Sequence, residues 1–124
     1  MQFIQDNGEQ TEYFFKEGCH ITELLNSPEN PEISVARARV EPGQTTRWHR
    51  LTDIAEHYLI VEGRGLAEVG EKSVYEVSAE DVVVIPAGVR QRITNTGEVD
   101  LLFLAICTPR FVPEAYHDIE AELD

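Results

Sequence analysis

The sequence predicts an all-β fold, a barrel or a sandwich, and three observations support this prediction. Short runs rich in β-branched and aromatic residues follow one another along the chain. Glycine, proline and asparagine separate these runs at the intervals expected of turns between strands. The 124 residues contain no internal repeat and no linker, so a single domain is expected.

The first third of the chain reads as strands and loops in alternation. Phe14–Phe15 and Cys19–Leu25 are predicted to be early strands. Ser27–Pro31 is a loop, because its two prolines fix φ and remove ladder donors. Residues 33–40 alternate apolar and polar side chains, as a strand does, and Pro42–Gly43 then turns the chain.

The remaining strands are predicted from similar runs. Val82–Ile85 is a continuous β-branched run, which is typical of a strand buried on both faces. Pro113 is expected to begin a short helix in an acidic tail. The other predicted strands span residues 56–61, 66–69, 74–77, 90–95 and 101–107. The predicted core draws on Val35, Ile60, Val83, Ile85, Ile93, Phe103 and Ile106.

Two blocks of residues carry a recognisable spacing. The first, at about 43–63, contains Gly43, His49, Glu56 and Gly63. The second, at about 80–95, contains Pro86, Gly88 and Asn95. Together the blocks resemble the two signature motifs of the cupin superfamily, over roughly residues 40–108.

This resemblance implies a single cupin domain over residues 1–124. The implied fold is a cupin-type double-stranded β-helix barrel (a jelly roll) with a short C-terminal helix or acidic tail. The chain also departs from the family pattern: Leu51 stands at the position of the second histidine, Glu80 replaces a glycine, and Gln91 replaces the histidine of the second motif.

Alternation along the strands places the candidate site residues. His49 and Leu51 share one face of a strand, and so do Glu56 and Tyr58. Gln91 likewise shares a face with Ile93. The resemblance implies that these faces line the barrel lumen. It predicts His49, Glu56 and Gln91 as metal ligands, and a substrate pocket formed by Arg47, Leu51, Tyr58 and Ile93.

A glutamate in an apolar lumen needs compensation, because burying an unpaired charge is costly. One interpretation is a divalent transition metal (Fe, Mn, Ni or Zn) on His49, Glu56 and Gln91, since imidazole, carboxylate and amide oxygen suit these ions. A second is pairing of Glu56 with Arg47, Arg92 or His49 and no metal. A third places Glu56 at the exposed mouth of the barrel.

Two functional classes follow from these interpretations. In the first, the protein binds a metal and a small organic ligand, as a metal-dependent dioxygenase or isomerase would. In the second, it is a non-catalytic small-molecule-binding barrel with a degenerate, metal-free site. The fold class alone does not distinguish them, because one fold hosts many chemistries.

Composition limits the partners. A formal net charge of −13 excludes nucleic acid and anionic membranes as expected partners, because both attract basic surfaces. No apolar run approaches the ~18 residues of a membrane span. Cys19 and Cys107 are predicted to be buried reduced thiols, which points to the cytoplasm. A homodimer is expected, with Trp48 as a candidate interface residue; the alternative is that the tail from Phe111 to Tyr116 folds back over Trp48.

Overall fold

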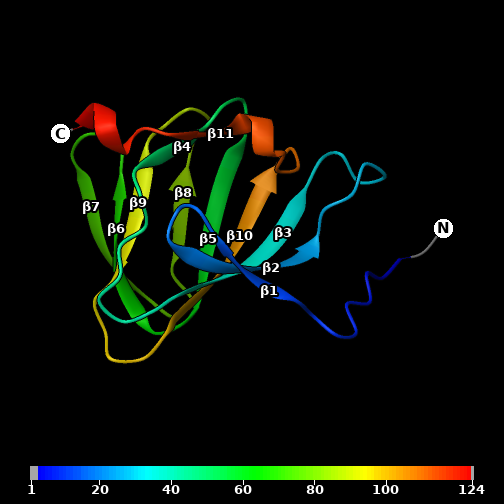
Figure 1. The fold of residues 1–124 in the computed structure, drawn as a ribbon, viewed down its shortest axis with the longest axis horizontal. Helices are drawn as coiled ribbons and strands as arrows, with labels where there is room; N and C mark the ends of the chain where they lie inside the picture. Colours follow the sequence, from blue (N-terminus) through cyan, green and yellow to red (C-terminus); the bar gives the residue numbers. More distant parts are fainter. Residues whose placement is uncertain (1–2, 124) are drawn as a thin grey trace.

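The computed structural model describes residues 3–123 and consists almost entirely of antiparallel strands in two sheets (Figure 1). The first sheet has the order β1-β2-β3-β10-β5-β8, and the second has the order β11-β4-β9-β6-β7. The strands are β1 (Glu12–Phe15), β2 (Cys19–Leu25), β3 (Ser34–Val40), β4 (His49–Leu51), β5 (Ala55–Glu62), β6 (Arg64–Val69), β7 (Ser73–Ser78), β8 (Val82–Ile85), β9 (Gln91–Asn95), β10 (Leu101–Thr108) and β11 (Tyr116–Asp118). The predicted all-β barrel architecture is therefore confirmed.

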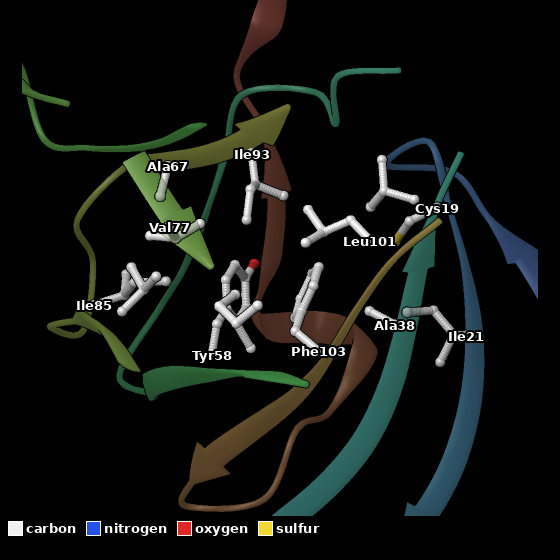
Figure 2. Close-up of a cluster of buried hydrophobic side chains, with 13 residues drawn as sticks. Cys19, Ile21, Ala38, Tyr58, Ala67, Val77, Ile85, Ile93, Leu101 and Phe103 are labelled. Atoms are coloured by element: carbon white, nitrogen blue, oxygen red, sulfur yellow. The ribbon is translucent and has the colours of Figure 1, made fainter. Parts of the chain in front are cut away.

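The core lies between the two sheets. Alternate side chains of β5 and β10 point inward, so that Tyr58 and Phe103 stack with their ring centroids 4.3 Å apart. Figure 2 shows these two rings side by side within the main cluster, with Ile85 toward one end and Ile21 toward the other. Because strand side chains alternate between faces, the same strands leave polar or half-buried residues on the outside.

The connection between the sheets depends on Gly63. This residue follows β5 of the first sheet and precedes β6 of the second, and it has a φ of +86°. A Cβ atom here would lie 2.7 Å from the backbone oxygen of Asp100. Glycine is therefore required both for the left-handed conformation and for the close approach of the neighbouring backbone.

Two details of the predicted core are wrong. Val82–Ile85 forms the edge strand β8, in which Val82 and Val84 are 53% and 60% exposed, so the run is not buried on both faces. Val35 and Ile106 are register partners across β3 and β10, but both lie on the outward parity and are only half-buried. The other predicted core residues are buried: Ile60, Val83, Ile85, Ile93 and Phe103.

The C-terminal segment forms a strand rather than a single helix. β11 pairs with β4, with Tyr116 opposite Leu51 and Asp118 opposite His49. The helical parts are two short 3-10 turns, Pro113–Ala115 and Glu120–Leu123. Pairing with β4 supplies backbone hydrogen bonds that an isolated short helix in water would not secure, because helix nucleation is costly.

The same segment is hydrogen-bonded to the backbone of Trp48. The backbone N–H of Trp48 donates to Glu120 Oε2 (2.7 Å), and its carbonyl accepts from the N–H of Ile119 (3.0 Å). The guanidinium groups of Arg90 and Arg92 lie 5.0 and 4.6 Å from the centroid of its ring. Trp48 is thus half-buried within one chain. Within residues 3–123, no helix has the length and apolar character to cross a bilayer.

Candidate functional site

A cavity lies inside the barrel, between β2, β3, β5 and β10 on one side and β4 and β11 on the other. It offers about 60 Å³ to the centres of water molecules, which is room for several of them. Its wall is mostly apolar and aromatic, and it also carries three carboxylates and one imidazole. The aromatic wall residues are Tyr13, Phe15, Tyr58, Phe103, Phe111 and Tyr116. The carboxylates and the imidazole are those of Glu17, Glu23, Glu56 and His49.

His49 has a polar contact at each ring nitrogen, a hydrogen bond at Nδ1 and an ion-pair contact at Nε2. Its Nδ1 lies 2.7 Å from the carbonyl oxygen of Arg47, which only accepts, so Nδ1 carries a proton. Its Nε2 lies 3.0 Å from Glu17 Oε2. This second contact places the imidazole of His49 against the carboxylate of Glu17 at the cavity wall.

Glu17 was not predicted from the sequence. It lies in the turn between β1 and β2, beside Gly18, whose φ is +100°. Its carbonyl accepts from the N–H of Arg47 (2.7 Å), which draws this turn against the segment before β4. Its other carboxyl oxygen accepts from the Cys19 thiol (3.0 Å). The glycine indicates a turn here, but no sequence signal shows that the turn reaches the lumen.

Glu56 is connected to Gln91 and Tyr58. The amide nitrogen of Gln91 donates to Glu56 Oε1 (2.9 Å), and the hydroxyl of Tyr58 donates to the amide oxygen of Gln91. Gln91 is also the register partner of His49 across β4 and β9. Of the three predicted metal ligands, His49 and Gln91 therefore lie on adjacent strands of the second sheet, and Glu56 reaches Gln91 from the first sheet across the interior.

The environment of Glu56 alters its acidity. Its side chain is buried, at 8% exposure. Burial raises the pKa of Glu56 to about 7, and the negative charge of Glu17 adds to this rise. The charge of His49 and the hydrogen bonds from Gln91 and Cys107 act in the opposite direction. At neutral pH this carboxyl is therefore divided between its acid and base forms.

The predicted pocket residues have different positions in the structure. Leu51 and Tyr58 line the cavity. Ile93 is fully buried in the main core cluster and does not line it. Arg47 lies outside the cavity, where its Nε donates to Asp118 Oδ2 (2.6 Å) and holds the pKa of that carboxyl below its usual range.

The alternative pairings of Glu56 are also resolved. Arg92 pairs with Glu68 at 2.8 Å, and Arg47 pairs with Asp118, so neither guanidinium compensates Glu56. The low exposure of Glu56 contradicts the interpretation that places it at the open mouth. Its partners are instead the neutral amide of Gln91 and the thiol of Cys107, whose Sγ lies 3.6 Å from Oε2.

Both cysteines are free and buried, as predicted. Burial is the largest cause that raises the pKa of each thiol, and nearby carboxylates raise it further. The thiols therefore stay protonated at neutral pH and act as weak donors to Glu17 and Glu56. Nucleophilic chemistry by either sulfur is not favoured.

The donor set does not present a ready metal site in this arrangement. Within residues 3–123, no three His, Cys, Asp or Glu side chains are grouped so that they could hold an ion. Gln91 directs its amide hydrogens toward Glu56, while its oxygen accepts from Tyr58. Leu51 offers no donor atom. The ligand set of His49, Glu56 and Gln91 stays a prediction.

Comparisons with known proteins agree with this architecture. The cupin domain family matches residues 36–107. An uncharacterized protein of Methanocaldococcus jannaschii is 34% identical over 110 residues, which cover 87% of this chain and 85% of that protein.

Solved structures resemble the whole chain. The nucleoside dehydratase Pac13 of Streptomyces superposes with a TM-score of 0.79 at 17% identity, over 97% of this chain and 92% of that one. A predicted oxalate decarboxylase of Thermotoga maritima superposes with a TM-score of 0.76 at 25% identity, over 86% and 99% of the two chains. On the family match, the sequence relative and the double-stranded barrel, this chain belongs to the cupin family.

Proposed function

We propose that the lumen cavity binds a small organic molecule and catalyses proton transfer on it, as an isomerase or a dehydratase would. The observation that carries the proposal is the presence of two groups able to transfer protons on facing sides of the cavity. His49 Nε2 lies 3.0 Å from Glu17 Oε2 on one side, and Glu56, with a pKa of about 7, lies on the other. General acids and bases work best when their pKa lies near the working pH.

Each group has a defined part in this proposal. The Glu56 carboxylate takes a proton from a carbon of the ligand, and the released electron pair moves toward a neighbouring atom. The imidazolium form of His49, paired with Glu17, delivers its Nε2 proton to that atom in an isomerisation, or to a leaving hydroxyl as water in a dehydration. No electrons are gained or lost overall, so no oxidant or reductant is needed.

Gln91 and Tyr58 are positioning residues in this scheme. The amide of Gln91 holds Glu56 Oε1, and Tyr58 in turn fixes the orientation of that amide. Pac13, a nucleoside dehydratase, offers a parallel in the same fold. That likeness, at 17% identity, supports the fold and makes nucleosides a reasonable first class of compounds to test.

The test uses deuterium exchange in D₂O with uridine and a panel of small hydroxylated compounds. The wild-type protein is expected to incorporate deuterium at carbon or to release water, as followed by ¹H NMR and mass spectrometry. Glu56→Gln is expected to abolish both, because it removes the base while keeping the shape. Turnover that survives in Glu56→Gln would contradict the proposal.

A divalent metal site is the second candidate, and one observation favours it. The Nδ1 of His49 is fixed by a backbone carbonyl, the arrangement that metal-binding histidines commonly use to present Nε2. Binding would require Nε2 to leave Glu17 and the amide of Gln91 to turn its oxygen toward the ion. Fe, Mn, Ni or Zn would suit such a set. Activity that disappears with a chelator and returns with one of these ions would favour this candidate.

A further inference from the structure

The cavity wall carries more acidic than basic side chains. Three carboxylates line it, those of Glu17, Glu23 and Glu56, and no lysine or arginine does. The one basic group, His49, is already engaged by Glu17. Lys16 is exposed and lies over the ring of Tyr116, with its Nζ 4.8 Å from the centroid, but it is not part of the wall. Because Glu17 is paired with His49, the excess negative charge of the cavity comes from Glu56 and from the exposed Glu23, and it attracts cations and repels anions.

The carboxylates of the wall also have unused hydrogen-bond acceptor positions. Glu17 accepts from Cys19 and lies in ion-pair contact with His49, and Glu56 accepts from Gln91 and Cys107. A carboxylate offers about four acceptor positions, so each retains unused capacity. Glu23, near the mouth, accepts one bond from the hydroxyl of Tyr13 (3.3 Å). A guest that brings its own N–H donors would satisfy these oxygens.

A polar guest could also satisfy a hydroxyl of the wall that has no hydrogen-bond partner within the protein. Tyr116 is 7% exposed and lines the cavity, and its ring stacks on His49 with centroids 5.2 Å apart. Its Oη is the one buried side-chain nitrogen or oxygen within residues 3–123 that has no hydrogen-bond partner. Buried polar groups are nearly always satisfied, by water or ligand where protein provides no partner.

The rest of the wall suits an apolar body. Phe15, Phe103 and Phe111 face the cavity, together with Leu51 and Ile21. Burial of the apolar part of a ligand against this surface is favourable, because it removes apolar area from water. The same surface offers no partner to a second charged group. The combination of carboxylates and aromatic rings is therefore complementary to a molecule with one cationic end and an otherwise apolar structure.

We propose that the ligand of this cavity is a small organic cation, an ammonium group on an apolar body, rather than a carboxylate. This inference rests on the proposed function in one respect, that the cavity is the ligand site. It makes the substrate class an amine. It also separates this chain from any cupin that acts on a dianion such as oxalate, because the cavity wall has no lysine or arginine to receive one.

Three probes of nearly equal size test the inference: isobutylammonium, isobutanol and isobutyrate. Each is titrated at neutral pH into ¹⁵N-labelled protein as purified, with its metal content measured alongside. We expect isobutylammonium to bind at least tenfold more tightly than isobutanol, and isobutyrate to bind more weakly than both.

The other outcomes overturn the inference in distinguishable ways. If isobutanol binds as tightly as isobutylammonium, the cavity is a ligand site without the proposed charge preference, and the proposed function stands. Tighter binding of isobutyrate would also overturn it and, together with a stoichiometric metal, would favour the metal candidate. If none of the three binds, both the inference and the proposed ligand site are wrong.

A matched pair of variants tests whether the preference for the cation over the alcohol originates in the cavity. Glu23→Gln removes one charge at the cavity mouth and leaves His49, Glu17 and Glu56 intact. Glu71→Gln removes one charge from the exposed turn between β6 and β7. We expect the preference for isobutylammonium over isobutanol to fall about threefold in Glu23→Gln and to stay unchanged in Glu71→Gln. An equal fall in both would mean that the net charge of the chain attracts the cation, and would overturn the assignment to the cavity.

Discussion

His49 Nε2 lies 3.0 Å from Glu17 Oε2, and this contact joins the first residue of β4 to the turn between β1 and β2. A second bond supports it, because the N–H of Arg47 donates to the carbonyl of Glu17 at 2.7 Å. His49, the histidine of the first motif, is therefore contacted by a carboxylate that lies outside both motifs. The surroundings of His49 depend on how the N-terminal hairpin packs.

Replacing Glu17 tests that dependence. Glu17→Ala leaves the buried Nε2 of His49 without its partner, and an unsatisfied buried polar group costs about 1–3 kcal/mol. We expect the free energy of unfolding in urea to fall by that amount. Glu23→Ala, at the exposed mouth, is the control and should lower it by less than about 0.5 kcal/mol. Equal losses in the two variants would show that the contact with His49 does not stabilise the fold.

The raised pKa of Glu56 predicts a pH-dependent stability. Its value is 4.5 in the absence of the fold and about 7 within it. Between these two pH values the folded protein keeps a proton that the unfolded chain has released, so stability falls as pH rises and levels off above about pH 7. Glu56→Gln lacks this titration.

The stability of Glu56→Gln relative to wild type should therefore increase between about pH 5 and pH 8. The full shift corresponds to about 3 kcal/mol, at 1.36 kcal/mol for each pH unit. Urea unfolding at several pH values in the presence of a chelator measures the difference. A difference that does not vary with pH would mean that Glu56 is already ionised in the folded protein.

The inward face of the site was predictable because strand side chains alternate strictly. His49 and Leu51 lie in β4, Glu56 and Tyr58 in β5, and Gln91 in β9, and all five are buried as the spacing predicted. The alternation fails for Arg47 because β4 begins only at His49, so Arg47 is outside the strand and turns to Asp118.

Other features depended on tertiary contacts that no local pattern contains. A β-branched run looks the same in a central strand and in an edge strand, so the exposure of Val82 and Val84 could not be read from Val82–Ile85. The pairing of β11 with β4 likewise joins segments far apart in sequence. The contribution of Glu17 has the same origin, because its turn reaches the lumen only when the barrel is closed.

Substitutions at two glycines of the motifs distinguish the cost of a left-handed backbone from the cost of a steric clash. Gly88 has a φ of +80° and open space around a hypothetical Cβ, so Gly88→Ala should cost about 1–2 kcal/mol of stability. Gly63 has a φ of +86°, but a Cβ would meet the backbone oxygen of Asp100 at 2.7 Å. Gly63→Ala should therefore cost about 1–3 kcal/mol more than Gly88→Ala in urea unfolding. Equal costs would mean that the turn after β5 relaxes freely.

Leu51 tests the second functional candidate. Its side chain lines the cavity in the same short strand as His49, where the family pattern has another histidine. Leu51→His exchanges an aliphatic group for an imidazole donor, and we expect divalent-metal affinity to rise by about tenfold or more. Calorimetric titration with Mn²⁺ or Zn²⁺ measures this, with Leu59→His as a control on the outward face of β5. Unchanged affinity in a folded Leu51→His variant would contradict a latent metal site at this end of the barrel.

The last prediction concerns assembly, and we propose that the chain forms a homodimer through the edge of its first sheet. Val82 and Val84 of edge strand β8 are exposed, and so is Val61 of the neighbouring strand β5. An exposed apolar edge invites pairing with a second chain. Sedimentation is expected to give twice the 14.0 kDa of the chain, and Val84→Lys is expected to give the monomer.

Two controls distinguish this edge from the other surfaces. Val74→Lys introduces the same change at an exposed valine of β7, in the other sheet, and should leave the dimer intact. Trp48→Ala should also leave it intact, because the ring of Trp48 already has Arg90 and Arg92 as partners within one chain. A monomeric wild type would refute the dimer. A dimer that is lost in Trp48→Ala but kept in Val84→Lys would place the interface beside β4 and β11 instead.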